Sequence, residues 1–208
     1  MSEGLVLYRR VASRAFAVLW MLEELGLSYR DENLGRPGGP RPPALLEVSP
    51  TGVTPALSDG EVRVTEAPAI CLYLADRYGY GTLAPRIEDP ERGRYLQWTV
   101  YATAVVEPAR ELQLTTLTPT RNAYGLGWPK FEQVAEHLAR AVETGPWLLG
   151  ERFSAADVML GSVISISLVC GTIPALPALT AYVERLRDRP GFQRAEKINW
   201  PPDRFAGS

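Results

Sequence analysis

The sequence predicts a two-domain protein in which a small α/β domain precedes an all-helical domain. Strand-forming runs alternate with helical periodicity only in residues 1–80. A stretch rich in Gly, Pro and charge follows, and strand signals nearly vanish beyond it. The 208 residues are enough for two small domains with a sizeable core. We therefore assign 1–80 to the α/β domain, 81–89 to a linker and 90–208 to the helical domain.

The first part of the α/β domain reads as a strand, a helix and a second strand. LVLYR (5–9) is rich in strand formers, and SRAFAVLWMLEELG then places apolar residues at helical spacing. Ser13 is the expected cap of that helix, and Gly26 ends it. SYRDENL (28–34) completes a βαβ unit. A Pro/Gly loop and a short helix at ALLEV come next.

The remainder of this domain is a hairpin and a helix, which gives the order β-α-β-α-β-β-α. An Asp-Gly pair joins the segments 54–58 and 61–65, and such a pair between alternating residues favours a tight hairpin turn. Thr65 is the expected cap of a helix that runs to about Tyr78.

Helical periodicity dominates the second domain. PERGRYLQWTVYATAVVEPARELQL reads as one long helix, in which Pro108 predicts a kink near Val106–Glu107. WPKFEQVAEHLARAVE is amphipathic, whereas SAADVMLGSVISISLVC is apolar nearly all round and predicts a central, buried helix. Ser154 and Asp157 fit a capping box at its start. ALPALTAYVERLRD and PGFQRAEK close the chain.

Composition excludes several classes of function. The net charge of -2 points neither to nucleic acid nor to an anionic membrane surface. With one histidine and two cysteines, the sequence offers no metal cluster, His-based triad or C-x-x-C pair. We expect His137 on a solvated helix face and Cys71 and Cys170 as free buried thiols. The absence of a secretory signal favours the cytoplasm.

Three residues at one edge of the α/β unit have both a structural and a functional interpretation. Pro55 heads a strand, and a cis bond at Thr54–Pro55 would turn the Thr54 backbone outward to pair with a peptide. Glu66 either complements a helix dipole or binds a cationic amine beside the helix terminus. Ser13 is either a plain cap or a hydroxyl that donates to an anion, such as a ligand thiolate.

Four segments of the chain resemble the glutathione S-transferase superfamily in order and spacing. They are SPTGVTPAL (49–57), TEAPAICLYLADRYG (65–79), LWMLEELGLSY (19–29) and FSAADVMLG (153–161). The resemblance implies a thioredoxin-like N-terminal domain, an all-helical C-terminal domain, a homodimer and glutathione as co-substrate. It implies a transferase that conjugates or reduces a small electrophile with the glutathione thiolate, as in detoxification. A non-catalytic binding or interaction protein on the same fold is the alternative.

The resemblance also implies roles for individual residues around glutathione. Its binding site would comprise Val53, Thr54, Pro55, Glu66 and Ala67, with Pro55 in cis geometry. The Thr54 backbone would pair with the cysteinyl part, and Glu66 would take the γ-glutamyl amine. Two positions depart from the family pattern, because Ala67 replaces the usual serine and Val53 replaces a basic or polar residue. Each lost charge-assisted hydrogen bond is worth about 1.5–3 kcal/mol, unless a nearby arginine (Arg36, Arg41 or Arg10) compensates.

Ser13 fits the serine or cysteine class of catalytic site that the resemblance implies. Tyr8 is the alternative, and Arg14 is a candidate helper for the thiolate. The acceptor substrate would lie against residues of both domains. These candidate wall residues, whose other interpretation is ordinary packing, are Arg10, Val11, Tyr101, Val105 and Leu112.

Overall fold

The computed structural model describes residues 4–114 and 129–199, which form two compact units. Unit 1 comprises 4–80 together with 187–199, and unit 2 comprises 81–186. The predicted combination of an α/β domain and an all-helical domain is confirmed. No helix among the described residues is long and apolar enough to cross a membrane.

Unit 1 is built on a four-stranded mixed sheet in the order β2-β1-β3-β4. The central strand β1 (Leu5–Arg9) pairs in parallel with β2 (Tyr29–Asn33) and antiparallel with β3 (Ala56–Asp59). Strand β4 (Val62–Thr65) forms the predicted hairpin with β3. The order of strands and helices therefore matches the prediction.

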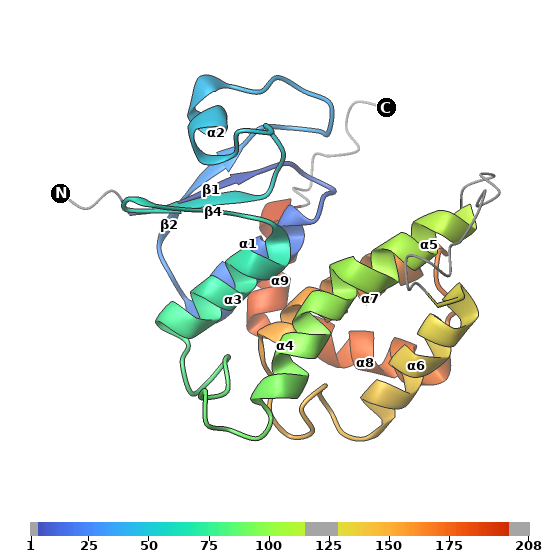
Figure 1. The fold of residues 1–208 in the computed structure, drawn as a ribbon. Coiled ribbons are helices and arrows are strands. Elements are labelled where there is room, and N and C mark those ends of the chain that lie inside the picture. Colours follow the sequence, from blue (N-terminus) through green and yellow to red (C-terminus); the bar gives the residue numbers. More distant parts are fainter. Residues whose placement is uncertain (1–3, 115–128, 200–208) are drawn as a thin grey trace. The chain divides into compact units, whose positions relative to one another are not determined.

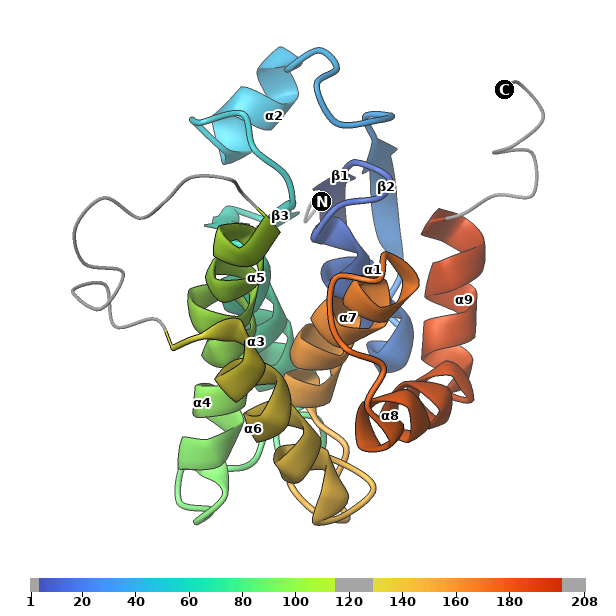
Figure 2. The same ribbon diagram turned by 90° about the vertical axis from the view of Figure 1, so that its right-hand side faces the viewer.

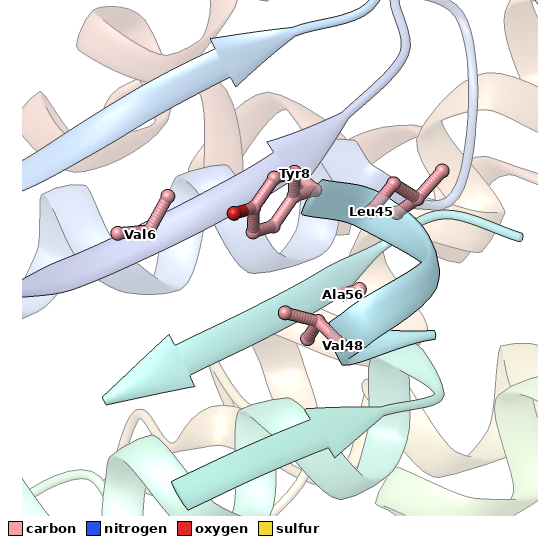
Figure 3. Packing of buried hydrophobic residues seen from close by; sticks show 5 residues of the cluster. All are labelled: Val6, Tyr8, Leu45, Val48 and Ala56. Atoms are coloured by element: carbon pink, nitrogen blue, oxygen red, sulfur yellow. The ribbon is translucent and has the colours of Figure 1, made fainter. Parts of the chain in front are cut away.

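Helices cover both faces of this sheet (Figure 1). Helix α2 (Pro43–Val48) lies on one face, and α1 (Ala15–Leu25) and α3 (Ala67–Tyr78) lie on the other. Figure 3 shows the contact beneath α2, where two of its side chains meet alternate residues of β1 and the first residue of β3. This cluster is Val6, Tyr8, Leu45, Val48 and Ala56. Alternation along a strand sends these side chains to the α2 face.

The predicted helix caps are displaced by one residue. Arg14 and Glu66, rather than Ser13 and Thr65, occupy the N-cap positions of α1 and α3, and neither makes a side-chain cap hydrogen bond. Thr65 instead ends strand β4. Gly26 ends α1 in the left-handed conformation, as predicted.

The last described helix, α9 (Pro190–Asn199), packs against α1 in unit 1 (Figure 2). Arg189, just before α9, makes a bidentate ion pair with Glu24 at 2.8 and 2.9 Å, and Trp20 donates to the same carboxylate. Phe192 contacts the Trp20 ring edge-on at 4.9 Å between centroids. This grouping differs from the expected range 90–208, because the charged and aromatic partners of the segment lie on α1.

Unit 2 is helical in its described part. Its elements are α4 (Arg92–Tyr101), η1 (Ala102–Val106), α5 (Glu107–Leu114), α6 (Phe131–Glu143), α7 (Ala155–Val169) and α8 (Pro177–Arg187). Twelve of the fifteen residues of α7 are buried, which confirms the prediction of a buried helix.

The long helix predicted before Leu114 is irregular where Pro108 disturbs it. Residues Ala102–Val106 form a π-helical turn, and the Glu107 N–H bonds to the Ala102 carbonyl. A proline lacks the N–H that an α-helix needs at that position, so the wider turn accommodates it.

The start of α7 is a buried polar network centred on Asp157. Its carboxylate accepts from the Leu148 N–H and Tyr182 hydroxyl through one oxygen, and from the Ser154 N–H and hydroxyl through the other. Complete burial raises the pKa of Asp157 to about 6, although these four hydrogen bonds favour the charged form. The predicted capping box is confirmed.

Two expectations about single residues are wrong. His137 is half-buried and packs on the rings of Trp98 and Tyr101, at 5.1 and 5.6 Å between centroids, rather than facing solvent. Cys170 is exposed at the end of α7, whereas Cys71 is buried and free as expected. Both errors arise because periodicity along one helix does not show which neighbour covers a given side.

Candidate functional site

The sheet register brings the predicted glutathione-binding segments to one end of the sheet. Tyr8 near the end of β1 pairs with Ala56 at the start of β3, and Ala56 in turn pairs with Thr65 at the end of β4. The loop after β1, the Thr54–Pro55 segment and Glu66 therefore emerge side by side. All of these residues belong to unit 1.

Ser13 lies in the loop between β1 and α1, half-buried and held on two sides. Its hydroxyl donates to the Arg10 carbonyl at 2.7 Å and accepts from the Ala15 N–H at 3.2 Å. Ala12 beside it has a φ of 54°, a backbone conformation that is uncommon for alanine. To donate to a bound thiolate, the Ser13 hydroxyl has to turn its proton away from the Arg10 carbonyl.

Tyr8, the alternative catalytic residue, is a core residue in this structure. Its side chain is in the cluster beneath α2, and only 6% of the residue is exposed (Figure 3). That position favours packing over catalysis, while the exposed Arg14 lies next to Ser13 at the start of α1.

Glu66 is exposed at the N-terminus of α3 in an unusual backbone conformation. Its φ is 68°, and its carbonyl accepts the Ile70 N–H, so it begins the helix. Its carboxylate makes no hydrogen bond or ion pair within the described residues. An uncommon φ in a non-glycine residue persists where the surrounding structure requires it, and such residues concentrate at ligand sites. The next residue, Ala67, is buried and opens the helix.

The segment before Pro55 is held by a serine whose role the sequence did not reveal. The buried Ser49 hydroxyl donates to the Val53 carbonyl at 2.9 Å and accepts from the Val53 N–H at 3.2 Å. The Thr54–Pro55 peptide bond is cis. Val53 is 54% exposed, so an apolar side chain faces solvent beside this segment. Ser49 was part of the quoted motif, but spacing alone gave no partner for it.

Of the three arginines that could replace the lost contacts to glutathione, Arg41 contacts Gly52 next to this segment. Its aliphatic stem covers Gly52, where an added Cβ would come within 2.5 Å of the Arg41 Cδ. Arg10 is committed elsewhere, since its guanidinium donates to four backbone carbonyls of the loop 34–40. Arg36 is exposed.

Comparison with known proteins places these features in a family. Residues 13–77 match the family model described as glutathione S-transferase, N-terminal domain, and 107–185 match glutathione S-transferase, C-terminal domain. Glutathione S-transferase F10 of Arabidopsis thaliana is 32% identical over 163 residues, which are 71% of this chain and 73% of that protein. The chain belongs to the glutathione S-transferase superfamily.

Two further relatives match nearly the whole chain. The disulfide-bond oxidoreductase YfcG of Escherichia coli is 29% identical over 203 residues, covering 91% of this chain and 93% of that protein. The theta class glutathione S-transferase of Xanthomonas axonopodis pv. citri, solved with glutathione bound, has a TM-score of 0.72 at 29% identity. That alignment covers 93% of this chain and 97% of that one.

The acceptor wall stays a prediction, because its candidate residues come from both units. In unit 1, Val11 is half-buried and Arg10 is buried. In unit 2, Tyr101, Val105 and Leu112 are half-buried, and Tyr101 packs edge-on against Trp98 at 5.4 Å. Partial burial raises the pKa of the Tyr101 phenol.

Proposed function

We propose that this chain is a glutathione transferase that uses the glutathione thiolate against a small electrophile. The observation that carries the proposal is the convergence of Ser13, Thr54–Pro55 and Glu66 at one end of the sheet, with the Glu66 carboxylate unpaired among the residues that the structure describes. Glu66 would bind the γ-glutamyl amine, and the Thr54 backbone would pair with the cysteinyl residue. The first-turn N–H groups of α3 would receive the γ-glutamyl carboxylate.

In the proposed reaction, Ser13 stabilises the glutathione thiolate. A thiol with an ordinary pKa of about 8.5 supplies little thiolate at neutral pH. A hydroxyl donor and the N-terminus of α1 would raise the thiolate fraction. The sulfur forms a bond to the electrophilic carbon, and the leaving group departs with the bonding electron pair. Glutathione gives up one proton to solvent in this step.

The test is calorimetric titration of the purified protein with reduced glutathione, beside the variant Glu66→Ala. We expect micromolar to low-millimolar binding that weakens by about tenfold or more in the variant, since a charge-assisted hydrogen bond is lost. Binding that is equal in both proteins would remove Glu66 from the site.

The alternative is a binding or interaction protein without transferase activity. Ala67 and the exposed Val53 favour it, since both departures remove polar contacts to glutathione. Absence of glutathione binding in the same titration would support this alternative over the transferase.

A second reaction is favoured by the match to a disulfide-bond oxidoreductase along 93% of that protein. Here one glutathione thiolate would attack a disulfide and release a thiol, and a second would resolve the mixed disulfide as oxidised glutathione. Burial raises the pKa of the Cys71 thiol to about 12, and in this route we assign both sulfurs to glutathione. Disulfide reduction that survives replacement of both cysteines by serine would support this route, and its loss would refute it.

The proposal includes a homodimer and a cytoplasmic location. Glutathione is kept largely reduced in the cytosol, which suits an enzyme that consumes its thiol. Conjugation of electrophiles there would serve detoxification.

A further inference from the structure

Arg10 joins the loop that carries Ser13 to the neighbouring loop 34–40. Its guanidinium is almost fully buried, with 7% of the residue exposed. Nη1 donates to the carbonyls of Leu34 and Arg36 at 2.6 and 2.9 Å, and Nη2 donates to those of Gly39 and Pro40 at 2.9 and 2.5 Å. All four acceptors are neutral, and no carboxylate among the described residues pairs with this cation.

Two backbone hydrogen bonds reinforce the same junction. The Leu34 N–H donates to the Arg9 carbonyl at 2.8 Å, and the Val11 N–H donates to the Gly35 carbonyl at 3.1 Å. The two loops are therefore held together on both sides of Arg10. A planar guanidinium with a fixed fork of donors suits such a task better than an ammonium group.

The same residue also orients the candidate catalytic hydroxyl. The Arg10 carbonyl accepts the Ser13 hydroxyl at 2.7 Å. When its side chain is held, the Arg10 backbone carbonyl is held as well. This carbonyl keeps Ser13 Oγ within hydrogen-bond distance of the Ala15 N–H. A thiolate within reach would draw the proton away from this neutral carbonyl, because hydrogen bonds to charged acceptors are stronger.

We infer that Arg10 is a positioning residue, which aligns Ser13 for the glutathione thiolate by clamping the loop 34–40 to the loop after β1. This inference rests on the proposed function. Arg9 does not share the role, since Asp31 engages its guanidinium at 2.7 Å through both carboxylate oxygens. Position matters because a hydroxyl displaced by about an ångström no longer donates effectively to the sulfur.

The variant Gly39→Ala tests the clamp without altering Arg10 or Ser13. An added Cβ at Gly39 would lie 2.7 Å from Arg10 Nη1, so the flexible guanidinium end has to move. Arg10→Lys is the companion variant, which keeps the charge but loses the fork. Gly93→Ala on α4 is the matched control, because nothing lies within 4 Å of its added Cβ.

The readout is the pH dependence of thiolate formation in the glutathione complex, followed by ultraviolet absorbance. We expect Gly39→Ala and Arg10→Lys each to raise the apparent thiol pKa by about one unit, which is tenfold less thiolate at pH values well below the wild-type pKa. In a Ser13→Ala background Gly39→Ala should add no further shift, since no hydroxyl remains to be aligned. Gly93→Ala should match the wild type.

Two results would overturn the inference. One is an unchanged thiol pKa in Gly39→Ala, and the other is a shift of equal size in the Ser13→Ala background. A wild type that forms no thiolate would instead refute the proposed function, and this inference with it. Hydrogen exchange at the Leu34 and Val11 amides tests the clamp without glutathione: it should accelerate in Gly39→Ala, and unaltered exchange would count against the clamp.

Discussion

The choice between Ser13 and Tyr8 as the catalytic hydroxyl is the central question at the scale of single residues. Sequence spacing kept both open, because each lies near the end of β1. The structure separates their surroundings: Ser13 is half-buried in a loop, and the Tyr8 side chain packs beneath α2. The Tyr8 hydroxyl makes no hydrogen bond within the described residues.

We predict that Ser13→Ala lowers turnover far more than Tyr8→Phe does. Loss of a hydrogen bond to a charged sulfur should reduce kcat/KM at mildly acidic pH by on the order of 10–100-fold. Calorimetry should show glutathione binding changed by no more than about threefold, because the hydroxyl acts mainly on the ionised thiol. Tyr8→Phe keeps the ring in the core and should stay within about twofold of wild-type kcat/KM.

Steady-state kinetics across pH, paired with titration of each variant, checks this prediction. Equal loss of binding and turnover in Ser13→Ala would remove Ser13 from the catalytic role. A larger loss in Tyr8→Phe would transfer that role to the tyrosine despite its burial.

The roles of Arg10 and Ser49 could not be read from the sequence, because no spacing rule identifies their hydrogen-bond partners. Arg10 was expected to line an acceptor pocket, yet its donors all reach carbonyls about 24–30 residues ahead. Ser49 holds the Val53 backbone through a local turn that no spacing rule identifies. By contrast, Pro55 could be singled out because proline is uncommon in strands, and Glu66 because a carboxylate at a helix N-terminus meets exposed N–H groups.

At the scale of helices and strands, local signals predicted the elements well, and tertiary contacts set the rest. The strand at 5–9 and the end of α1 at Gly26 follow from strand-forming residues and from left-handed glycine. The caps at Ser13 and Thr65 were misplaced by one residue, since the backbone geometry at the starts of α1 and α3 overrides cap preference. The packing of α9 on α1 depends on Arg189 and Glu24, which are far apart in sequence.

The start of α7 supports a prediction about stability. Asp157→Asn keeps the size of the side chain but replaces one carboxylate oxygen by an N–H₂ group, which cannot accept a hydrogen bond. That group would face either the Ser154 N–H or the donors of Leu148 and Tyr182. We expect the free energy of unfolding to fall by about 2–4 kcal/mol at neutral pH. Ser165→Ala is the control on the same helix, since the buried Ser165 hydroxyl has no partner among the described residues and its removal should be neutral.

The difference in the free energy of unfolding between the wild type and Asp157→Asn should depend on pH in one direction. The folded-state pKa of Asp157 is about 6, above the ordinary 3.8, so the folded state binds the proton more tightly. The stability that the folded state gains by binding this proton is fully present below pH 3.8 and is lost as pH rises through about 6. The stability of the wild type relative to Asp157→Asn should therefore increase by on the order of 2–3 kcal/mol as pH falls through that window. Urea unfolding at several pH values measures it, and a difference that shrinks toward acid would contradict the assignment.

At the scale of the whole molecule, the fold class could be predicted because the two halves of the chain differ in their strand and helix signals. Strand signals confined to the first part, and a helix apolar nearly all round in the second, were enough for the architecture. The expected linker, residues 81–89, makes specific contacts with the helical unit that its composition did not indicate. The Ala155 N–H donates to the Leu83 carbonyl, and Arg152 pairs with Asp89, so this stretch is part of unit 2.

The proposed homodimer yields the prediction that belongs to this scale. Leu96 and Val100 lie four residues apart on α4, share one side of the helix and are 38% and 47% exposed. A self-complementary dimer that buried them could not accept four unpaired carboxylates. We therefore expect the double variant Leu96→Glu, Val100→Glu to sediment as a monomer of 22.9 kDa, whereas the wild type sediments as a dimer of twice that mass. Val169→Glu, at a 68% exposed position on α7, should leave the dimer intact. A wild type that sediments as a single chain would refute the dimer, and a double variant that stays dimeric would move the interface away from this side of α4.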